Sequence, residues 1–393
     1  MRFLFTVQPG QGHLNLMLPL ARVTREAGHS VVFASARSFA RSVESAGFEL
    51  LPAGIDWTEA ETDVHFPGAG GPGSGLMMER DVFAGHTATA MVPDLVDHIR
   101  AWRADAVVRD AWEFASCVAA EKEGIPYATC NPTLFAPDLL TSLFDTRLKD
   151  LRRAHGLEPV DDFAMLHRYL DLAFFPPEFT EESEVVAPVT HFLGSTTETT
   201  TPRPEWIDAL PPRPTVHVSF GTVVSATELY RDVIAALSEE NVNVIVATGP
   251  NVDASVLGAL PANVRLERYV PHAHLLPRCD LFITHGGFGS ALMALETGVP
   301  VLVLPIWADQ PRNARVCEKI GIGRQLQEGA RSIPQIREAA RAILGRPSYR
   351  QRAQDARSAL ARLPPASAAA GLLERLVQTG APGLRSTSIA AGD

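Results

Sequence analysis

One histidine near the start of the chain has the type and the position to do chemistry. In the stretch "FTVQPGQGHLN", residues 5–15, an apolar strand-like run ends in a turn that contains Gly10 and Gly12, and His13 stands where a helix is expected to begin. A neutral imidazole accepts a proton near pH 7, so His13 is a candidate general base. A histidine that caps the helix or packs in the core is the other interpretation, and this stretch alone leaves both open.

A second glycine-rich turn, far along the chain, has the character of an anion site. The apolar strand "LFITH" leads into "GGFGS", which opens a helix at residues 286–290. Gly286, Gly287 and Gly289 let a ligand approach the backbone, where free N–H groups and the helix dipole favour a diphosphate. Ser290 adds a hydroxyl donor. Many α/β proteins use such a turn only for tight packing, so this turn needs support from its surroundings.

That support comes from "WADQ", residues 307–310, at the end of the following apolar strand. The carboxylate of Asp309 and the amide of Gln310 can hydrogen-bond to the hydroxyls of a sugar. Ligands of open α/β sheets bind at the carboxyl ends of strands, where both stretches are expected. A solvated loop that caps the next helix is the alternative for these two residues.

The elements that must position these residues alternate between strands and helices. Apolar β-rich runs followed by amphipathic helical patterns predict parallel sheets covered on both faces, first up to about residue 130 and again after the linker. Residues 195–215 hold six threonines and five prolines, which is typical of an extended linker. The expected boundaries are 1–195 for an N-terminal Rossmann-like domain, 196–215 for the linker, 216–362 for a C-terminal Rossmann-like domain, 363–379 for a helix that packs back on the N-terminal domain, and 380–393 for a disordered tail.

The composition excludes several kinds of partner. The chain of 393 residues, 46% hydrophobic and 20% charged, has the length and composition of a globular protein with two domains. Its net charge of −10 argues against a broad nucleic-acid-binding surface and against attraction to anionic membranes. No signal peptide or membrane span is apparent, and the four scattered cysteines are expected as buried, reduced side chains. We therefore expect a cytoplasmic protein.

The motifs between residues 268 and 314 resemble the donor-binding signature of nucleotide-sugar-dependent glycosyltransferases with the GT-B fold. They include "VPHAHLLP", "THGGFGS", "GVP" and "DQPRNA". The chain is most similar to the bacterial enzymes that glycosylate natural products such as macrolides, enediynes and aromatic polyketides. The resemblance extends to "GQGHLN", to "FPP" at residues 175–177 and to "VSFGT" at residues 218–222, so it spans nearly the whole chain. It implies two Rossmann-like α/β domains that face each other across a cleft.

The resemblance also implies an inverting transfer of a sugar to a hydroxyl of a lipophilic aglycone, without a metal ion or a cofactor. His13 matches the histidine that acts as the general base in this family, and Asp110 matches the acidic residue that orients it. A carboxylate in that position fixes the tautomer of the imidazole and stabilises the imidazolium that forms. The N-terminal domain would bind the acceptor, with Gly10 and Gly12 in the loop beside the base. The C-terminal domain would bind the donor through Thr222, His285, Gly286, Gly287, Gly289 and Ser290 for the diphosphate, Tyr269, Val270 and Met293 for the base and ribose, and Trp307, Asp309 and Gln310 for the sugar.

One position departs from the family pattern. Members that use UDP-sugars often carry a glutamate three residues after the position of Ser290, where it binds the two ribose hydroxyls, and Met293 stands there in this chain. A thioether offers no acceptor of comparable strength, so the change fits a deoxyribose and favours a dTDP-sugar over a UDP-sugar. A glutamate lost for unrelated reasons is the alternative. Residues 65–85 and 134–179, rich in Phe, Leu and Met, are expected to shape an apolar acceptor pocket.

Two other functions stay open at this point. Nucleotide-sugar epimerases that act on UDP-N-acetylglucosamine share the architecture, although they lack the "GHLN" loop together with "WADQ". Some natural-product pathways use a non-catalytic helper protein beside a glycosyltransferase, and the retention of His13, Asp110 and the diphosphate turn argues against that role. The oligomeric state, a homodimer included, is also left open by the sequence.

Overall fold

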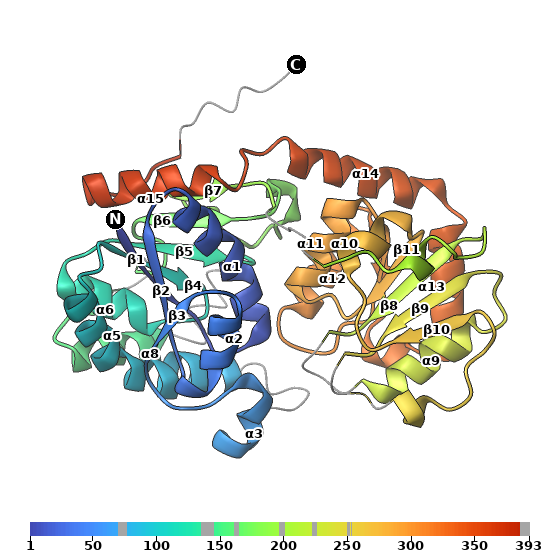
Figure 1. Ribbon diagram of the computed structural model, residues 1–393, viewed down its shortest axis with the longest axis horizontal. Helices are drawn as coiled ribbons and strands as arrows, with labels where there is room; N and C mark the ends of the chain where they lie inside the picture. The colour runs from blue at the N-terminus through green and yellow to red at the C-terminus, as the bar shows by residue number, and fades with distance from the viewer. Residues whose placement is uncertain are drawn as a thin grey trace. The chain divides into compact units, whose positions relative to one another are not determined.

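The computed structural model describes residues 1–69, 77–134, 145–160, 165–195, 201–221, 226–249, 252 and 254–385. The chain divides into two compact α/β units, each built on a parallel sheet with helices packed against it (Figure 1). Unit 1 comprises Met1–Phe175, Glu182–Thr196 and Pro364–Asp393, and unit 2 comprises Pro176–Glu181 and Thr197–Leu363. The expected pair of Rossmann-like units is confirmed.

Unit 1 is organised around a parallel sheet of seven strands in the order β3-β2-β1-β4-β5-β6-β7. The strands are β1 (Arg2–Thr6), β2 (Ser30–Ser35), β3 (Glu49–Pro52), β4 (Ala106–Asp110), β5 (Tyr127–Asn131), β6 (Leu170–Ala173) and β7 (Thr190–Phe192). β1 and β4 lie side by side although about a hundred residues separate them in the chain, because the strand order reverses there. Such a reversal leaves a crevice at the carboxyl ends of the two strands, where ligands of open α/β sheets bind.

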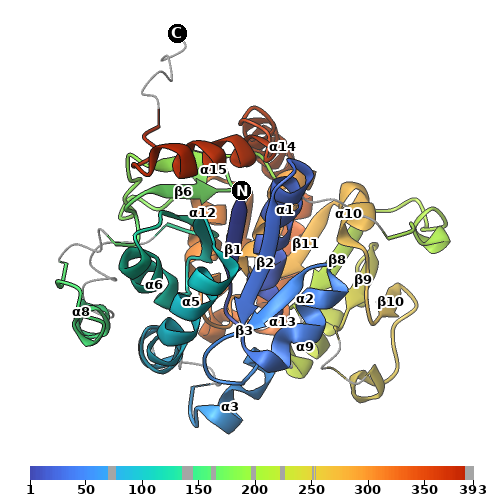
Figure 2. The ribbon, with the colours of Figure 1, turned by 60° about the vertical axis from the view of Figure 1, so that its left-hand side comes forward.

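Helices cover both faces of this sheet, because its central strands are apolar on both sides. The helical segments of unit 1 are α1 (Gln11–Glu26), η1 (Arg37–Phe39), α2 (Ala40–Ser45), η2 (Glu59–Glu61), α3 (Thr62–His65), η3 (Met78–Thr87), α5 (Ala88–Trp102), α6 (Ala115–Glu123), α8 (Asp145–Ala154) and α15 (Ala368–Thr379). One core lies between the sheet and α5 and α6, and the other lies between the sheet and α1 and α15. Figure 2 shows α15, from the end of the chain, lying on the same unit as α1 and β6.

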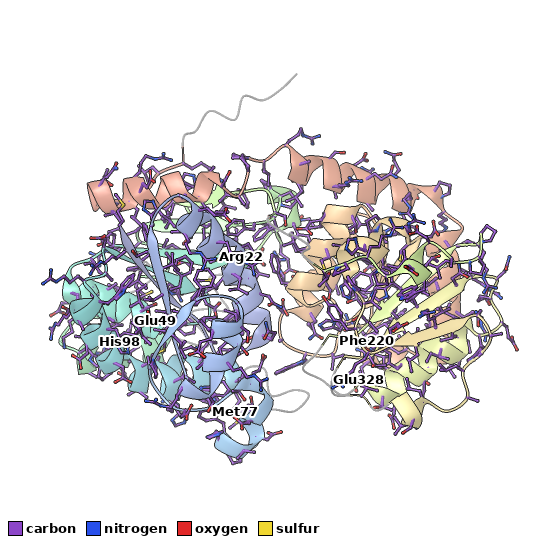
Figure 3. The ribbon with its side chains drawn as sticks, in the orientation of Figure 1. Arg22, Glu49, Met77, His98, Phe220 and Glu328 are labelled. Carbon is purple, nitrogen blue, oxygen red and sulfur yellow. The ribbon has the colours of Figure 1, made fainter. Side chains whose placement is uncertain are left out.

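Unit 2 repeats this plan with a parallel sheet of six strands in the order β10-β9-β8-β11-β12-β13. The strands are β8 (Thr215–Ser219), β9 (Asn243–Ala247), β10 (Val264–Glu267), β11 (Leu281–Thr284), β12 (Val301–Val303) and β13 (Gly323–Gln325). The helical segments are η4 (Pro177–Phe179), η5 (Glu205–Ile207), α9 (Thr227–Leu237), η6 (Ala254–Leu257), α10 (His272–Leu275), η7 (Leu276–Arg278), α11 (Phe288–Thr297), α12 (Gln310–Lys319), η8 (Glu328–Ala330), α13 (Ile333–Leu344) and α14 (Pro347–Ala361). Phe220 is buried in the core of this unit, whereas Glu328 lies on its surface (Figure 3).

A short segment of the first half of the chain belongs to unit 2. Residues Pro176–Glu181, which include the "FPP" motif's last prolines, pack on α12. The guanidinium of Arg312 lies over the ring of Phe179 at 5.1 Å and donates to its carbonyl oxygen at 2.8 Å. Arg315 pairs with Glu181 at 2.7 Å. The expected first domain of residues 1–195 included this segment, which belongs to unit 2 in the structure. Amino-acid composition does not indicate against which unit a six-residue segment packs.

Two other segments differ from the sequence-based expectation. The part of the expected linker at residues 201–215 is not simply extended, because η5 forms within it and Ile207 is buried in unit 2. The expected disorder of residues 380–393 does not hold for residues 381–385, where Gly383 donates to the carbonyl of Tyr169 at 2.7 Å and Arg385 to that of Pro188 at 2.9 Å. Residues 196–200 and 386–393 lie outside the described residues.

Two expectations from composition concern the cysteines and the helices. All four cysteines are free and buried, as expected, and burial raises the pKa of Cys117 to about 11. In the portion of the chain that is described, no helix has the length and apolar character needed to cross a membrane.

Candidate active site

The candidate base lies where β1 and β4 meet. The chain leaves β1 at Thr6 and enters α1 through its N-cap residue Gly10, so His13 stands in the first turn of the helix. β4 ends at Asp110. Because Thr6 is paired with Arg109 in the sheet, the side chains that follow these two strands meet at its carboxyl edge. Nδ1 of His13 lies 2.6 Å from Oδ2 of Asp110.

Asp110 is held as a carboxylate although it is buried. Its side chain is 0% exposed, whereas that of His13 is 18% exposed. The backbone N–H groups of Gln8 and Trp112 donate to it at 3.4 Å and 3.3 Å. Burial would raise the pKa of Asp110, but the charge and hydrogen bond of His13 and the N–H of Trp112 together lower it. A carboxylate at Nδ1 favours the tautomer that has its proton on Nδ1 and its lone pair on Nε2.

Four aromatic side chains form a cluster beside the imidazole. The ring of Phe83 meets that of His13 edge to face, with centroids 5.8 Å apart and an interplanar angle of 86°. Phe83 in turn lies 6.4 Å from Trp57 and 6.5 Å from Trp112, and Trp57 lies 5.1 Å from Phe66. We call Trp57, Phe66, Phe83 and Trp112 the aromatic wall. Phe83 belongs to η3, a π-helix, and such widened turns occur often at functional sites.

The two glycines of the first loop have different surroundings. Gly10 has φ −130°, an extended conformation that any residue adopts, so its backbone does not require glycine. A Cβ at Gly10 would instead collide with the carboxylate of Glu59 and lie 3.1 Å from Cδ2 of His13. A Cβ at Gly12, inside α1, would meet open space. Glu59 was not predicted from the sequence, because no motif connects it with the loop that it contacts.

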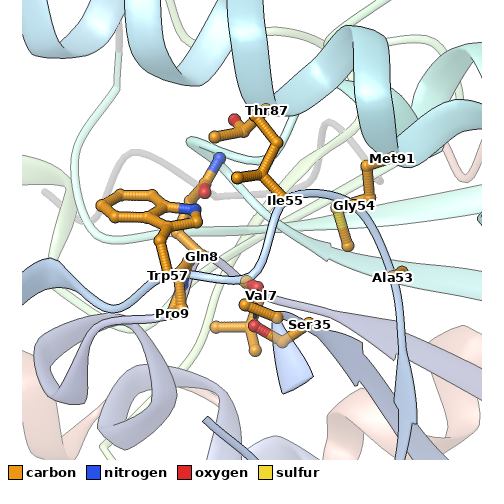
Figure 4. A pocket seen from close by; sticks show the side chains of 11 residues that line it. Val7, Gln8, Pro9, Ser35, Ala53, Gly54, Ile55, Trp57, Thr87 and Met91 are labelled. Carbon is orange, nitrogen blue, oxygen red and sulfur yellow. Dashed lines mark hydrogen bonds between the residues drawn. The ribbon is translucent and has the colours of Figure 1, made fainter. Parts of the chain in front are cut away.

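A small pocket opens at the carboxyl ends of β1, β2 and β3 (Figure 4). Its cavity volume is about 10 Å³, which is roughly the room that one water molecule needs. The lining residues are Val7, Gln8, Pro9, Ser35, Ala36, Ala53, Gly54, Ile55, Trp57, Thr87 and Met91. Two of the polar side chains donate to the protein itself, Gln8 to the carbonyl of Trp112 and Ser35 to that of Val7. None of these lining residues comes from 65–85 or 134–179, the stretches expected to shape an acceptor pocket, and both stretches are described only in part.

In unit 2 the glycine-rich turn joins β11 to α11 at the carboxyl edge of the sheet. Gly286 has φ +84°, and a Cβ there would collide with the side chain of Val303 on the neighbouring strand β12. Both the backbone conformation and the lack of room require glycine at this position. Gly289 is exposed with open space beside it, and Ser290 is buried in the first turn of α11.

The imidazole of His285 is packed against two residues that lack a side chain. A Cβ at Gly221 would lie 3.0 Å from Nε2 of His285, and a Cβ at Gly287 would lie 2.7 Å from the same atom. Burial lowers the pKa of His285 to about 4, so this imidazole is neutral at pH 7. In a neutral imidazole one nitrogen donates a hydrogen bond and the other accepts one. The uncharged ring therefore has no net electrostatic attraction for an anion.

The carboxylate of Asp309 is already engaged within the protein. Its Oδ2 accepts from the N–H of Phe288 at 3.0 Å, which caps the start of α11, and from Nδ2 of Asn313 at 2.8 Å. Burial raises the pKa of Asp309 above its ordinary value despite these bonds. The preceding residue, Ala308, has φ +52°, an uncommon conformation for a residue with a Cβ. The side chain of Asp309 therefore supports the glycine-rich turn, which the sequence interpretation did not foresee.

Gln310 is also bound to its own loop. Its Oε1 accepts from the N–H groups of Ile306 at 2.8 Å and Trp307 at 3.0 Å. Asn313, one turn further along α12, donates to the carbonyl oxygen of Gly286 at 2.9 Å as well as to Asp309. Asn313 is part of the "DQPRNA" motif, yet nothing in the sequence assigned it this position between the two loops.

The remaining positions expected to contact the nucleotide lie around these loops. Tyr269 is 69% exposed, whereas Val270 is 1% exposed. Met293 is half-buried on α11 and Trp307 is half-buried after β12. Thr222 lies outside the described residues.

A second histidine–aspartate pair in unit 1 has nearly the same local geometry as the first. Nδ1 of His167 lies 2.5 Å from Oδ2 of Asp171, with side-chain exposures of 19% and 0%. Asp171 is in β6 and His167 precedes that strand, so this pair joins residues four positions apart at the amino end of β6. It provides an internal comparison for the pair that joins β1 to β4.

Comparison with known proteins relates the whole chain to sugar-transferring enzymes. Residues 231–376 match the family described as "Erythromycin biosynthesis protein CIII-like, C-terminal domain". The 4'-demethylrebeccamycin synthase of Lentzea aerocolonigenes is 31% identical over 96% of this chain and 99% of its own. The L-demethylnoviosyl transferase of Streptomyces niveus is 31% identical over 95% of this chain and 97% of its own.

Solved structures give the same result in three dimensions. The glycosyltransferase VinC in complex with dTDP has a TM-score of 0.77 and 26% identity, with 96% of this chain and 100% of the other covered. The glycosyltransferase SnogD from Streptomyces nogalater has a TM-score of 0.75 and 25% identity, with 96% and 99% covered. These matches extend through both units.

Proposed function

Since this chain belongs to the nucleotide-sugar-dependent glycosyltransferases of antibiotic biosynthesis, we propose that it transfers a sugar from a dTDP-sugar to a hydroxyl of a lipophilic aglycone with inversion at the anomeric carbon. The observation that carries this proposal is the 2.6 Å contact between His13 Nδ1 and Asp110 Oδ2, which links the loop after β1 to the end of β4. His13 is the general base, and Asp110 is the residue that orients it.

The step follows from the chemistry of the two side chains. Nε2 of His13 takes the proton of the acceptor hydroxyl as its oxygen attacks the anomeric carbon of the donor. The bond between that carbon and the diphosphate oxygen breaks, and the diphosphate leaves with the electron pair. Asp110 stabilises the imidazolium that forms on His13. A single displacement of this kind inverts the anomeric configuration and forms no covalent glycosyl-enzyme.

The turn at residues 285–290 is the proposed site of the diphosphate. Its backbone N–H groups lie at the N-terminus of α11. The positive end of the helix dipole there stabilises the charge that develops on the leaving group. Gly286 and Gly287 bring the backbone close to the ligand, and Ser290 adds a hydroxyl. This stabilisation needs no metal ion or cofactor. Asp309 and Gln310 keep the loop after β12 in place and offer their remaining polar atoms to the sugar.

For the nucleotide we propose dTDP rather than UDP, with Tyr269, Val270 and Met293 around the base and ribose. The thioether of Met293 on α11 offers a ribose 2′-hydroxyl no strong acceptor, whereas a deoxyribose does not need one. The similarity to VinC, whose structure holds dTDP, supports this choice.

The experiment that tests this function measures release of dTDP when the purified protein is incubated with dTDP-glucose and a phenolic acceptor. We expect release that depends on the acceptor and a product of inverted anomeric configuration by NMR. His13→Ala is expected to abolish turnover while dTDP still binds in calorimetry. Turnover that survives His13→Ala unchanged would remove the proposed base, and a product of retained configuration would remove the single displacement.

A further inference from the structure

We propose that Glu59 is an acceptor-binding carboxylate, which receives a hydrogen bond from a second hydroxyl or N–H group next to the hydroxyl that reacts. The preferred acceptor is then a flat aromatic compound with two adjacent donor groups. This inference rests on the proposed function, because it takes His13 as the group that faces the reacting hydroxyl.

Glu59 approaches the reactive side of the candidate base. Its Cδ lies 3.0 Å, and Cδ2 of His13 lies 3.1 Å, from the point that a Cβ of Gly10 would occupy. In an imidazole Cδ2 is bonded to Nε2, across the ring from Nδ1, which Asp110 contacts. Glu59 and the Cδ2 atom of His13 therefore lie against the same point beside Gly10, so the carboxylate is a neighbour of the imidazole edge that carries Cδ2. Asp110 contacts the imidazole at Nδ1.

The backbone around Glu59 is tied to the loop of the base. The N–H of Glu59 donates to the carbonyl oxygen of Pro9 at 2.9 Å, which joins η2 to the residue before Gly10. The hydroxyl of Thr62 donates to the carbonyl oxygen of Glu59 at 2.7 Å. These bonds hold the segment in place, and only a glycine at position 10 leaves room for the carboxylate there.

A carboxylate in this place accepts hydrogen bonds and donates none, so it selects groups that carry a proton. When one of two adjacent hydroxyls of the acceptor gives its proton to His13, the other hydroxyl is within reach of the Glu59 carboxylate. A hydrogen bond to a charged partner contributes roughly tenfold or more to affinity. Within the aromatic wall Trp57 and Phe83 are buried in the core, and the half-buried rings of Phe66 and Trp112 supply the surface against which a flat ring packs.

The test compares two coumarins that differ by one hydroxyl, 7-hydroxy-4-methylcoumarin and 7,8-dihydroxy-4-methylcoumarin. Each is titrated calorimetrically into the protein saturated with dTDP, so the result does not depend on turnover. We expect the dihydroxy compound to bind the natural protein about tenfold more tightly than the monohydroxy compound. In Glu59→Gln we expect this preference to fall to about twofold or less.

Glu61→Gln is the matched control, because Glu61 lies on the same short helix η2 and its carboxylate accepts from Thr58. It is expected to keep the tenfold preference. Gly10→Ala is a second route to the same result, since the added methyl group displaces the carboxylate of Glu59. Thermal unfolding of each variant shows whether it is folded at the temperature of the titration.

Three results would overturn the inference. The natural protein could bind both coumarins equally, Glu59→Gln could keep the preference, or neither coumarin could bind, which would remove the flat aromatic acceptor. An equal loss of affinity for both compounds in Glu59→Gln would also count against it, because that describes a general electrostatic effect. Failure of the proposed function is seen separately, as dTDP release that survives His13→Ala, and leaves these titrations unaffected.

Discussion

Asp110→Asn is expected to lower kcat roughly a thousandfold with the fold intact. The amide oxygen of the new side chain can take the place of Oδ2 and keep the bonds from His13 Nδ1 and from the N–H of Gln8. The amide nitrogen then faces the N–H of Trp112, and that bond of 3.3 Å is lost. The variant thus keeps the tautomer of His13, and its loss of rate comes from the missing negative charge.

The magnitude follows from the distance between the charges. The bonded atoms are 2.6 Å apart, and the charges are spread over a carboxylate and a ring, so their centres are about 4 Å apart. At an effective dielectric constant of about 20, two unit charges at that distance interact by about 4 kcal/mol. Only the transition state, in which His13 becomes an imidazolium, has this stabilisation to lose. Because about 1.4 kcal/mol corresponds to a tenfold change in rate, kcat falls by about 10³.

The assay measures dTDP release under saturating donor and acceptor across a range of pH. In Asp110→Asn the acidic limb of kcat/KM is also expected to move to lower pH, because the imidazolium has lost its counter-charge. Asp171→Asn is the control, since it removes the charge from a His–Asp pair of nearly equal distance and burial that has no role in the proposed mechanism. A fall in kcat of less than tenfold in Asp110→Asn, or an equal fall in Asp171→Asn, would refute the reasoning.

Three further changes have expected outcomes. Met293→Glu should raise affinity for UDP relative to dTDP about tenfold in calorimetry, since the carboxylate can accept from a ribose 2′-hydroxyl; an unchanged ratio would count against the role of this position. Gly287→Ala should weaken dTDP binding at least tenfold, because its methyl group meets the imidazole of His285, whereas Gly329→Ala, with open space beside it, should not. Burial lowers the pKa of His272 to about 4, so the unfolded chain, with a pKa near 6.5, takes up this proton first, and the free energy of unfolding declines as pH falls from about 6.5 to about 4. Thermal melts should show a smaller decline in His272→Gln, and an equal slope in both proteins would contradict the assignment.

The sequence predicts the parts of the site that depend on local pattern. The strand before His13, the strand before Gly286 and the helices that follow are visible as apolar runs and glycine-rich turns, and both sheets form as expected. The pairing of His13 with Asp110 depends on β1 lying beside β4, which strand alternation alone does not determine. The resemblance to a glycosyltransferase family predicts this pairing, and the structure gives its distance.

Contacts between segments distant in sequence account for what was not predicted. Asp309 is expected to face a sugar, and the sequence did not predict that its Oδ2 also bonds to Phe288 and Asn313, because the loop after β12 packs against the start of α11. Glu59 has no motif of its own, since its position depends on the bond to Pro9 and on the bare Cα of Gly10. Such contacts depend on tertiary packing, and the residues that make them show no periodic sequence pattern from which the contacts could be predicted.

The docking of Pro176–Glu181 on α12 limits how this enzyme can be recombined with its relatives. A hybrid joined at residue 196 would keep Phe179 and Glu181 from one parent and take Arg312 and Arg315 from the other, so the stacking and the ion pair would join mismatched partners. The return of residues 364–385 to unit 1 adds a second mismatch in the same hybrid. Exchange of unit 2 therefore calls for a discontinuous graft, in which residues 176–181 are transferred together with 197–363 and the C-terminal helix α15 stays with unit 1.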